Sequence, residues 1–550
     1  MHEYTVDTKM EHFLKKLQEQ IHLRHDKLAL CDYQGRQRTY GELAAEIEQY
    51  HLFFRSAGIK EGDKVAIVAR NSVRWGVFFL SLNTYGAVAV PILPNFTPEG
   101  TAQLVNHSDS ICLIIDNDLW KSLRKIGLPN IHIVLDAVEE RILYYEDETV
   151  KSAWENRGKL FSEKYPDGFN PADVTYHEKM DSLGIINYTS GTSGDPKGVM
   201  LSFGSMSDIV EYCRKTISEK PDTIVSMLPM AHIYGLIMEF LYPCCTGFTI
   251  HFLGKVPSPS LLMESMQELK PSLIITVPLV MEKLYNTLIK PAVNTRQAKA
   301  MRTIPGLRTS FYKSLGKKVL SALGGRVQTI IIGGAPLNWK VESAFRKIGL
   351  PYAVGYGMTE ACPLLAFEMP DKFVSGSCGK PVHVVKIDSS DPERIPGEIQ
   401  AKGPNICLGY YKNPAADEAA HTADGWFRTG DLGIMDEDGN IFIRGRIKAL
   451  ILSASGQNIY PEEVEQVLSR HGAVEESLVL ERAGKVTALV FPRPHAVAGA
   501  DDQELERLAI DIRDKTNQHL PKFSQIFRVE IVDSPFERTA KGTMKRHLYV

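Results

Sequence analysis

Cysteine is sparse in this sequence and follows no pattern. Eight cysteines are spread over 550 residues, with no Cys-x-x-Cys pair and no Cys/His spacing of the kind that holds zinc. A disulfide framework and a structural zinc site are therefore both disfavoured. This usage is typical of a protein from a reducing compartment, and we expect a cytoplasmic protein.

An excess of charge of either sign is also missing. The 63 Lys and Arg residues nearly balance the 66 Asp and Glu residues, giving a formal net charge of −3. This balance argues against general nucleic-acid binding. The hydrophobic content of 44% and the charged content of 23% are ordinary for a soluble globular enzyme. At roughly 150 residues per domain, the length predicts three or four lobes.

No apolar run is long and uninterrupted enough to predict a membrane span. The first twenty residues contain no apolar core of the signal-peptide type. The runs 75–93 and 235–253 approach spanning length, but the first is broken by Pro91 and the second contains Glu239 and Pro243. We interpret both as buried core elements of a soluble protein.

Helix-like and strand-like patterns alternate in the first part of the chain. Residues 38–72 show apolar positions at helical spacing, a Gly stop and the strand-like KVAIVA, and the order helix then strand returns in 75–92 and in 101–116. Such alternation predicts parallel strands with helices on both faces of a sheet. The expected fold class is therefore α/β.

The stretch YTSGTSGDPKGVM, from Tyr188 to Met200, has the composition of a phosphate-binding loop. Its glycines allow close approach of backbone N–H groups, its hydroxyls add donors, and Lys197 adds a positive charge. It is neither a GxxxxGK[ST] P-loop nor a GxGxxG turn. A buried strand over 183–189 leads into it, and a short strand and a helix follow. The alternative is a flexible Gly/Ser linker.

Two further strands are predicted to end in glycine-rich turns. They are RVQTIIIGGAPL, residues 326–337, and PYAVGYGMTEACPL, residues 351–364. Strand ends that open into glycine turns predict a crevice at the carboxyl edge of one sheet.

These three segments, together with Thr429-Gly430-Asp431, resemble the motifs of the adenylate-forming superfamily. That superfamily includes acyl-CoA synthetases, aryl-CoA ligases, peptide-synthetase adenylation domains and beetle luciferases. The resemblance covers the chain from about residue 40 to its end. It implies a large N-terminal domain of layered α/β sheets over 1–447 and a small mobile C-terminal α+β domain over 448–550, with a hinge at Lys448.

The resemblance also implies an ATP site. The glycine-rich loop would hold the leaving phosphates, Tyr356 would stack on adenine, Asp431 would accept the ribose hydroxyls, and Glu360 would bind Mg²⁺, with Thr189 as a second candidate metal ligand. The implied nucleotide-binding residues are Thr189, Ser190, Gly191, Thr192, Ser193, Gly194, Lys197, Gly334, Ala335, Pro336, Tyr356, Gly357, Met358, Asp431, Arg446, Lys448 and Gly456.

Two catalytic candidates come from the same resemblance. His232 matches a Pro-x-x-His-x-x-Gly element and would lie beside the substrate carboxylate, where it positions the substrate and stabilises charge. A general base is not needed, because a carboxylate is already ionised at neutral pH. A lone His is otherwise more often structural. Thr359 would lie at the α-phosphate.

The terminal motif ERTAKGTMKRHLY departs from the superfamily pattern Thr-x-x-Gly-Lys-x-x-Arg. Aligning Gly542 and Arg546 puts Thr543 where the adenylation lysine is expected. We assign that role to Lys541 and keep Lys545 as the alternative. The alternative is that this segment is a basic surface tail without a role in catalysis. The altered motif is also the only support for a non-catalytic adenylate-binding sensor.

The stretch 290–326 contains nine Lys or Arg residues and no Asp or Glu. Such a stretch can be an ordinary solvated surface. The functional alternatives are a patch that attracts the phosphates of coenzyme A, or one that contacts an anionic membrane surface.

The resemblance implies a two-step ligase with ATP and Mg²⁺ as cofactors and coenzyme A as co-substrate. A fatty acid would form an acyl-adenylate with release of pyrophosphate, and the thiol would then displace AMP. The segments AHIYG, GGAPLN and GYGMTEACPL are most similar to those of bacterial long- or medium-chain fatty-acyl-CoA synthetases. An acyl carrier protein as acceptor, and an aryl-CoA ligase, remain alternatives.

Overall fold

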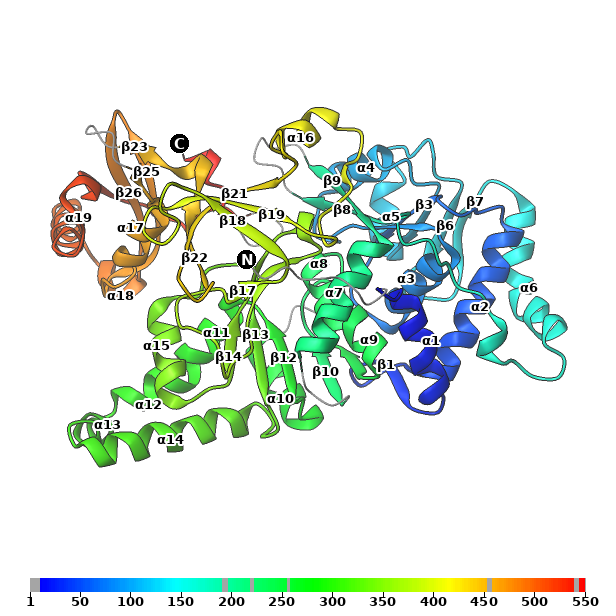
Figure 1. The fold of residues 1–550 in the computed structure, drawn as a ribbon, viewed down its shortest axis with the longest axis horizontal. Coiled ribbons are helices and arrows are strands. Elements are labelled where there is room, and N and C mark those ends of the chain that lie inside the picture. Colours follow the sequence, from blue (N-terminus) through cyan, green and yellow to red (C-terminus); the bar gives the residue numbers. More distant parts are fainter. Residues whose placement is uncertain are drawn as a thin grey trace. The chain divides into compact units, whose positions relative to one another are not determined.

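The computed structural model describes residues 10–189, 196–217, 222–254, 258–452, 458–538 and 544–549 (Figure 1). The chain divides into two compact units. The first holds Met1–Ser375 and Lys402–Ala419, and the second holds Gly376–Ala401 and Ala420–Val550. Lys448 lies inside the second unit, and its role as a hinge remains a prediction.

The main element of the first unit is an eight-stranded sheet. Its order is β20 (Gly409–Tyr410), β9 (Lys197–Ser202), β8 (Leu183–Thr189), β4 (Val88–Pro91), β3 (Lys64–Val68), β5 (Cys112–Ile115), β6 (Ile133–Asp136) and β7 (Ile142–Tyr145). The central strands from β8 to β6 are parallel. β7, β9 and β20 are antiparallel to their neighbours. The central strands are buried along almost their whole length, as expected of a parallel sheet covered on both faces.

Local sequence explains where the connecting helices begin and end. Helix α2 (Tyr40–Ser56) starts at a capping box between Thr39 and Glu42. Helix α3 (Val73–Tyr85) starts at Ser72 and ends where Gly86 adopts φ +88°. The other helices of this part are α1 (Phe13–Leu23), α4 (Pro98–His107), α5 (Asn117–Leu123) and α6 (Glu148–Lys164).

The first unit also contains a mixed four-stranded sheet and a parallel three-stranded sheet. The mixed sheet has the order β10 (Thr223–Ser226), β11 (Thr249–Phe252), β1 (Leu28–Asp32) and β2 (Gln37–Thr39), and the parallel sheet has the order β12 (Leu273–Thr276), β13 (Thr329–Ile332) and β14 (Tyr352–Val354). In the mixed sheet only the pair β1–β2 is antiparallel. A short antiparallel pair, β15 (Tyr356–Gly357) and β16 (Leu364–Phe367), follows β14.

The helices that accompany these sheets include two π-helical segments, η2 (Leu236–Leu241) and η3 (Tyr285–Ile289). The others are α7 (Phe203–Thr216), α8 (Ile233–Gly235), α9 (Tyr242–Thr246), α10 (Pro259–Leu269), α11 (Pro278–Leu284), α12 (Lys290–Asn294), α13 (Arg296–Met301), α14 (Pro305–Ala322), α15 (Trp339–Ile348), α16 (Pro414–Ala419) and the 3₁₀ turns η1 (Pro171–Asp173) and η4 (Thr359–Ala361).

The second unit is α+β. One sheet has the order β18 (Val384–Asp388), β19 (Gly397–Lys402), β21 (Phe427–Met435) and β22 (Ile441–Arg446), and another has the order β25 (Val474–Arg482), β26 (Lys485–Pro492) and β27 (Arg528–Ile531). Helices α17 (Pro461–Leu468) and α19 (Asp502–Asn517) bury their apolar faces in a core with this last sheet. The shorter elements are β23 (Ile451–Leu452), β24 (Asn458–Ile459), α18 (Pro494–Val497), η5 (Ile447–Ala449), η6 (Lys522–Ser524) and η7 (Arg546–Leu548).

The fold confirms the predicted α/β class with its α+β C-terminal part. The apolar runs 75–93 and 235–253 form buried core elements, as expected. Within the described ranges, we find no helix with the length and apolar character needed to cross a membrane. All eight cysteines lie in described residues and none is in a disulfide there; seven of them are buried.

Candidate functional site

The predicted phosphate loop joins two antiparallel strands of the main sheet. Thr189, the last residue of β8, pairs with Lys197, the first residue of β9. The predicted strand over 183–189, the short strand after the loop and the helix that follows are all present. The predicted contacts of Ser190, Gly191, Thr192, Ser193 and Gly194 lie outside the described residues, so the structure places only the two ends of this loop.

Lys197 lies over an aromatic ring that arrives from a distant part of the chain. The Nζ atom of Lys197 is 4.8 Å from the centroid of the Tyr410 ring. Tyr410 belongs to β20, which pairs with β9 so that Tyr410 lies opposite Val199. The edge strand therefore brings an aromatic face to the cation at the end of the phosphate loop.

The two predicted glycine turns follow neighbouring parallel strands, as expected. β13 pairs with β14 in parallel, and the N–H of Gly355 donates to the carbonyl of Ile332 at 2.9 Å. Gly334, which follows β13, has a φ of +86°, a conformation that side chains disfavour. Gly334, Ala335 and Pro336 are exposed at this edge. The turns thus lie together at the carboxyl edge of one sheet, where parallel sheets commonly bind nucleotides.

The second turn is tight for a steric reason. A Cβ atom at Gly357 would lie 1.8 Å from the carbonyl oxygen of Pro363. The same oxygen accepts a 2.7 Å hydrogen bond from the N–H of Met358. Gly357 therefore lets the chain fold back on itself directly before Thr359 and Glu360, which are each only 8% exposed.

The carboxyl group of Glu360 is held by the same edge-strand residue, Tyr410. The hydroxyl of Tyr410 donates to Glu360 Oε1 at 2.9 Å, and the N–H of Cys407 donates to the Glu360 carbonyl at 2.8 Å. Oε2 is not engaged by this contact and can serve a cation. Among the described residues, no cluster of three or more His, Cys, Asp or Glu side chains could hold a metal. One carboxylate suits Mg²⁺ that takes its other oxygen ligands from phosphates and water.

His232 lies in a turn that two side-chain amides hold in place. Its N–H donates to the carbonyl of Pro229 at 3.0 Å, and it caps the short helix α8. Asn187 of β8 donates to the carbonyl of Ala231 at 2.9 Å, and Asn71 accepts from the N–H of Met230 at 2.9 Å. Sequence reasoning missed both amides, because neither lies in a recognisable motif.

A buried acid holds the same turn from the other side. Glu239 lies in the π-helix η2, and its Oε2 accepts from the N–H groups of Met227 and Leu228 at 3.0 and 2.9 Å. Burial raises the pKa of the Glu239 carboxyl to about 8, partly offset by these two hydrogen bonds. The carboxyl is therefore largely protonated at neutral pH. Glu239 was noted in the sequence only as a residue that interrupts an apolar run.

Tyr234, two residues after His232, packs against the turn that follows β13. Its hydroxyl donates to the carbonyls of Thr276 and Ile331, both at 3.3 Å. A Cβ at Gly333 would lie 2.9 Å from the Tyr234 ring, so this ring packs directly on the turn that follows β13. The His232 segment and the glycine turn are thereby packed together within the first unit.

The predicted ribose clamp lies in the second unit. Thr429 donates its hydroxyl to the carbonyl of Ile399 at 2.7 Å and accepts from the N–H of Asp431 at 3.0 Å. The Nε atom of Arg446 lies 2.6 Å from Asp431 Oδ1. Asp431 and Arg446, both among the nucleotide-binding residues that the resemblance implies, are thus neighbours across the pair β21–β22.

The two candidate adenylation lysines differ in what the structure says of them. Lys541, like Gly456, lies outside the described residues. Lys545 is described, and its Nζ lies 3.1 Å from Glu537 Oε2. Arg546 forms two hydrogen bonds, of 2.7 and 2.6 Å, with the carboxyl of Glu465. The residue used to align the terminal motif is therefore anchored on α17.

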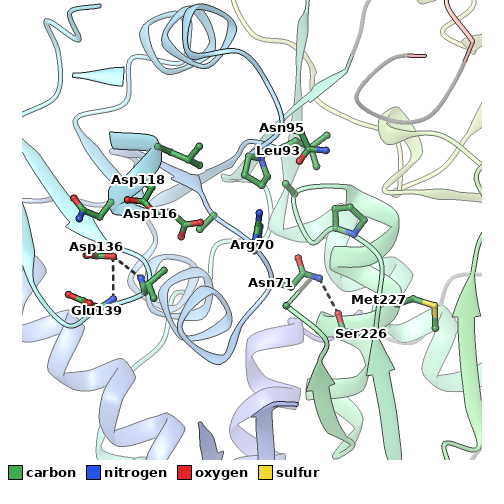
Figure 2. A pocket seen from close by; sticks show the side chains of 18 of the residues that line it. Arg70, Asn71, Leu93, Asn95, Asp116, Asp118, Asp136, Glu139, Ser226 and Met227 are labelled. Carbon is green, nitrogen blue, oxygen red and sulfur yellow. Dashed lines mark hydrogen bonds between the residues drawn. The ribbon is translucent and has the colours of Figure 1, made fainter. Parts of the chain in front are cut away.

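A pocket of about 850 Å³ opens at the carboxyl ends of β3, β4, β5 and β6 and of β10 (Figure 2). Its wall includes Pro229 and Ala231, so it adjoins the turn that carries His232. Figure 2 shows four acids on one side of the pocket, Asn71 hydrogen-bonded to Ser226 on the other, and Arg70 between them. The acids are Asp116, Asp118, Asp136 and Glu139. Since Arg141 is paired with Asp136 and Glu139, this pocket is a poor site for a polyphosphate.

The basic stretch 290–326 forms α12, α13, α14 and the turns around them. In the described part of the chain, only Arg326 among its nine cations has an ion-pair partner, Asp222. Ile304 and Leu307, at the start of α14, are 53% and 45% exposed. The stretch is therefore an exposed basic surface that also carries apolar side chains.

Comparison with known proteins gives consistent results over nearly the whole chain. The sequence model of the family described as AMP-binding enzyme matches residues 17–411, and that of the AMP-binding enzyme C-terminal domain matches residues 448–550. The long-chain-fatty-acid–CoA ligase FadD15 of Mycobacterium bovis is 28% identical over 84% of this chain and 78% of its own. The chloroplastic long-chain-fatty-acid–[acyl-carrier-protein] ligase AEE15 of Arabidopsis thaliana is 27% identical over 90% of this chain and 78% of its own.

Solved structures share the fold. ATP-bound MatB from Rhodopseudomonas palustris superposes with a TM-score of 0.77 at 24% identity, over 98% of both chains. O-succinylbenzoate coenzyme A synthetase (MenE) from Bacillus subtilis, in complex with ATP and magnesium ion, has a TM-score of 0.72 at 24% identity, over 97% of this chain and 98% of its own.

Proposed function

This chain belongs to the family of AMP-binding enzymes, and from that premise we propose that it is an AMP-forming fatty-acid–CoA ligase. The carboxylate of a fatty acid attacks the α-phosphorus of ATP, giving an acyl-adenylate and pyrophosphate. The thiol of coenzyme A then attacks the acyl carbon, giving acyl-CoA and AMP. The observation that carries the nucleotide chemistry is the grouping of Lys197, Tyr410 and Glu360 beside the phosphate loop.

In the first step the protein positions charged groups more than it moves protons. Lys197 and the loop after Thr189 bind the phosphates that leave, and Glu360 supplies a carboxylate oxygen for Mg²⁺, which neutralises phosphate charge. His232 orients the attacking carboxylate, and Thr359 binds at the α-phosphate. Catalysis at phosphorus of this kind rests on orientation and on electrostatic stabilisation.

In the second step we assign movement to the C-terminal domain. Residues 448–550 form that domain, and rotation about Lys448 withdraws the adenylation lysine, Lys541, and admits the thiol. The match of the C-terminal family model to 448–550 supports this division. The adenine would lie along Gly334–Pro336 with Tyr356 on its face, and Asp431 would bind the ribose hydroxyls.

The names of the relatives support a fatty acid as the substrate. FadD15 is named for long-chain fatty acids and CoA, whereas AEE15 is named for an acyl carrier protein as acceptor. Both acceptors present the same phosphopantetheine thiol, so the acid and the acceptor need separate tests. We favour CoA because several relatives of different origin are named CoA ligases.

The experiment that tests the function is pyrophosphate release from Mg-ATP with a series of acids. We expect release with straight-chain fatty acids and little release with acetate or benzoate. Absence of release with every acid would remove the enzyme proposal and favour an adenylate-binding sensor, and release only with aromatic acids would favour an aryl-CoA ligase. Thioester formation is then compared with CoA and with a phosphopantetheinylated carrier protein, and a preference for the carrier would overturn the CoA assignment.

We also propose that the basic stretch 290–326 contacts an anionic membrane surface, from which the fatty acid is drawn. Eight of its nine cations have no ion-pair partner among the described residues, and Ile304 and Leu307 expose apolar side chains beside Arg302 and Arg308. Each basic residue near an anionic surface contributes about 1 kcal/mol. The combination of cations and apolar side chains suits a lipid surface better than free CoA phosphates.

Vesicle flotation tests the membrane contact. We expect binding to vesicles that contain phosphatidylglycerol, weak binding to phosphatidylcholine alone, and loss of binding at high salt. The variant K313E/K317E should lose most of this binding while its KM for CoA stays unchanged, and K159E on α6 is the matched control. Salt-insensitive binding would overturn the proposal, and a raised KM for CoA in K313E/K317E would assign the surface to CoA instead.

A further inference from the structure

Tyr410 touches two groups that the proposed function places at the Mg-triphosphate. Its hydroxyl donates to Glu360 Oε1 at 2.9 Å, and the face of its ring lies 4.8 Å from Lys197 Nζ. The three residues come from separate segments of the first unit, and Glu360 lies 50 residues before Tyr410 in the chain. No motif of the sequence joins them.

Backbone hydrogen bonds and burial restrain the position of Tyr410. Its N–H donates to Asp417 Oδ1 at 2.6 Å, and its neighbour Tyr411 donates its N–H to the carbonyl of Gly198 at 2.7 Å. Tyr410 is only 7% exposed. The backbone that carries the ring is therefore bound to α16 on one side and to β9, the strand that carries Lys197, on the other.

We propose that Tyr410 is a positioning residue that orients the metal-binding carboxylate of Glu360 and keeps the ammonium group of Lys197 apart from it. This inference rests on the proposed function, because the two groups matter only if Mg-ATP binds between the phosphate loop and Glu360. In this proposal a single side chain, that of Tyr410, positions both Lys197, which faces the phosphates, and Glu360, which faces the metal.

The hydroxyl fixes which carboxylate oxygen is available. Because Tyr410 donates to Oε1, the orientation of the Glu360 carboxyl plane is restrained. Oε2 then remains available to bind the metal ion. Outer partners of this kind orient metal ligands in many sites.

The ring prevents a pairing that would block the site. Within the described residues, no ion pair joins Lys197 to any acid. A Lys and a Glu on facing segments would otherwise tend to pair with each other, and each would then be less available to phosphate or metal. The ring face attracts the ammonium group without neutralising it, so Lys197 stays charged and available.

The test compares Y410F, Y410L and the neighbouring control Y411F. The hydroxyl of Tyr411 bonds to Asp109 at 2.8 Å and not to Glu360, so Y411F removes an equivalent hydroxyl from the same strand end. The readout is the Mg²⁺ concentration that gives half-maximal pyrophosphate release at saturating ATP and acid. We expect this concentration to rise on the order of 10-fold in Y410F, as for other lost outer-sphere partners, and to stay unchanged in Y411F.

The leucine variant separates the ring from the hydroxyl. Y410L removes both, so it should add an increase in the KM for ATP, whereas Y410F should leave that KM within twofold of wild type. Melting temperatures of all three variants are measured in parallel. A lower melting temperature in Y410F with an unchanged Mg²⁺ requirement would show a purely structural role and overturn the proposal, as would an equal shift in Y411F.

A binding measurement keeps this inference distinct from the catalytic one. The increase in melting temperature produced by ATP with Mg²⁺, relative to ATP with EDTA, needs no turnover. If wild type shows that increase but releases no pyrophosphate, the ligase function fails while Tyr410 can still be judged: loss of the increase in Y410F alone supports its role, and retention overturns it. If wild type shows no effect of Mg²⁺ on ATP binding, the inference fails as well.

Discussion

The acid buried in the π-helix makes the stability of the first unit depend on pH. Glu239 is fully buried, and its pKa is raised from the ordinary value of 4.5 to about 8, first by desolvation. A folded-state pKa above the unfolded value means that the folded protein binds the proton more tightly. The stability that Glu239 contributes is therefore fully present below pH 4.5 and is lost as the pH rises through 8.

The size of the effect follows from the same two values. At 1.36 kcal/mol for each pKa unit, the difference corresponds to about 5 kcal/mol in total, of which about 2 to 3 kcal/mol falls between pH 6 and pH 8. Glu239→Gln removes the ionisation and keeps an oxygen to accept from the N–H groups of Met227 and Leu228. We expect E239Q to gain about that amount of stability relative to wild type as the pH rises from 6 to 8.

Urea unfolding followed by tryptophan fluorescence measures this difference. Four of the five tryptophans, Trp75, Trp120, Trp154 and Trp339, lie in the first unit, so the signal reports mainly on its unfolding. Histidines titrate in both proteins and cancel in the comparison. A constant difference in stability between E239Q and wild type from pH 6 to pH 8 would refute the reasoning.

Glu239→Leu is the control for the hydrogen bonds themselves. It leaves the N–H groups of the half-buried Met227 and the buried Leu228 without this acceptor, at a cost of up to about 1 to 3 kcal/mol for each. E239L should therefore be less stable than wild type at acid pH, where the wild-type Glu239 carboxyl is already protonated and its burial carries no ionisation penalty.

Three other predictions concern the reaction cycle. Lys541→Ala should abolish adenylate formation and spare thioester formation from supplied acyl-AMP, both followed by product chromatography; the same behaviour in Lys545→Ala instead would reassign the role. Lys448→Pro should spare adenylation and block thioester formation, and equal loss of both would count against a hinge there. Gly357→Ala should lower the free energy of unfolding by about 1 to 3 kcal/mol and raise the KM for ATP, because its Cβ would lie 1.8 Å from the Pro363 carbonyl oxygen. Unchanged thermal unfolding and unchanged ATP kinetics would show that the turn can relax.

Several parts of the fold were predictable because they depend on local chemistry. The strand over 183–189 and the turns after β13 and β14 were predicted from apolar runs that end in glycine. Glycine marks positions where the backbone needs unusual freedom or space, as at Gly334 and Gly357, and that requirement is visible in the residue type itself. The pairing of Asp431 with Arg446 also follows from a short hairpin.

Residues that support the site were not predictable in the same way. Asn187 binds the His232 turn across 44 residues of sequence, and Asn71 binds it across 159. Tyr410 lies in none of the motifs that were identified in the sequence. A buried amide or hydroxyl acquires its role from the partner that folding brings to it, and the spacing of such residues along the chain carries no sign of that partner.

The sequence by itself determined which chemical groups are available: a loop of glycines and hydroxyls with one lysine, a carboxylate after a tight turn, and the segment Thr429-Gly430-Asp431. These are set by residue type and by short-range backbone geometry. Only the tertiary structure decided that an edge strand, β20, pairs with β9 and brings Tyr410 between Lys197 and Glu360. The reason is physical, because strand pairing between distant segments is selected by the packing of the whole sheet.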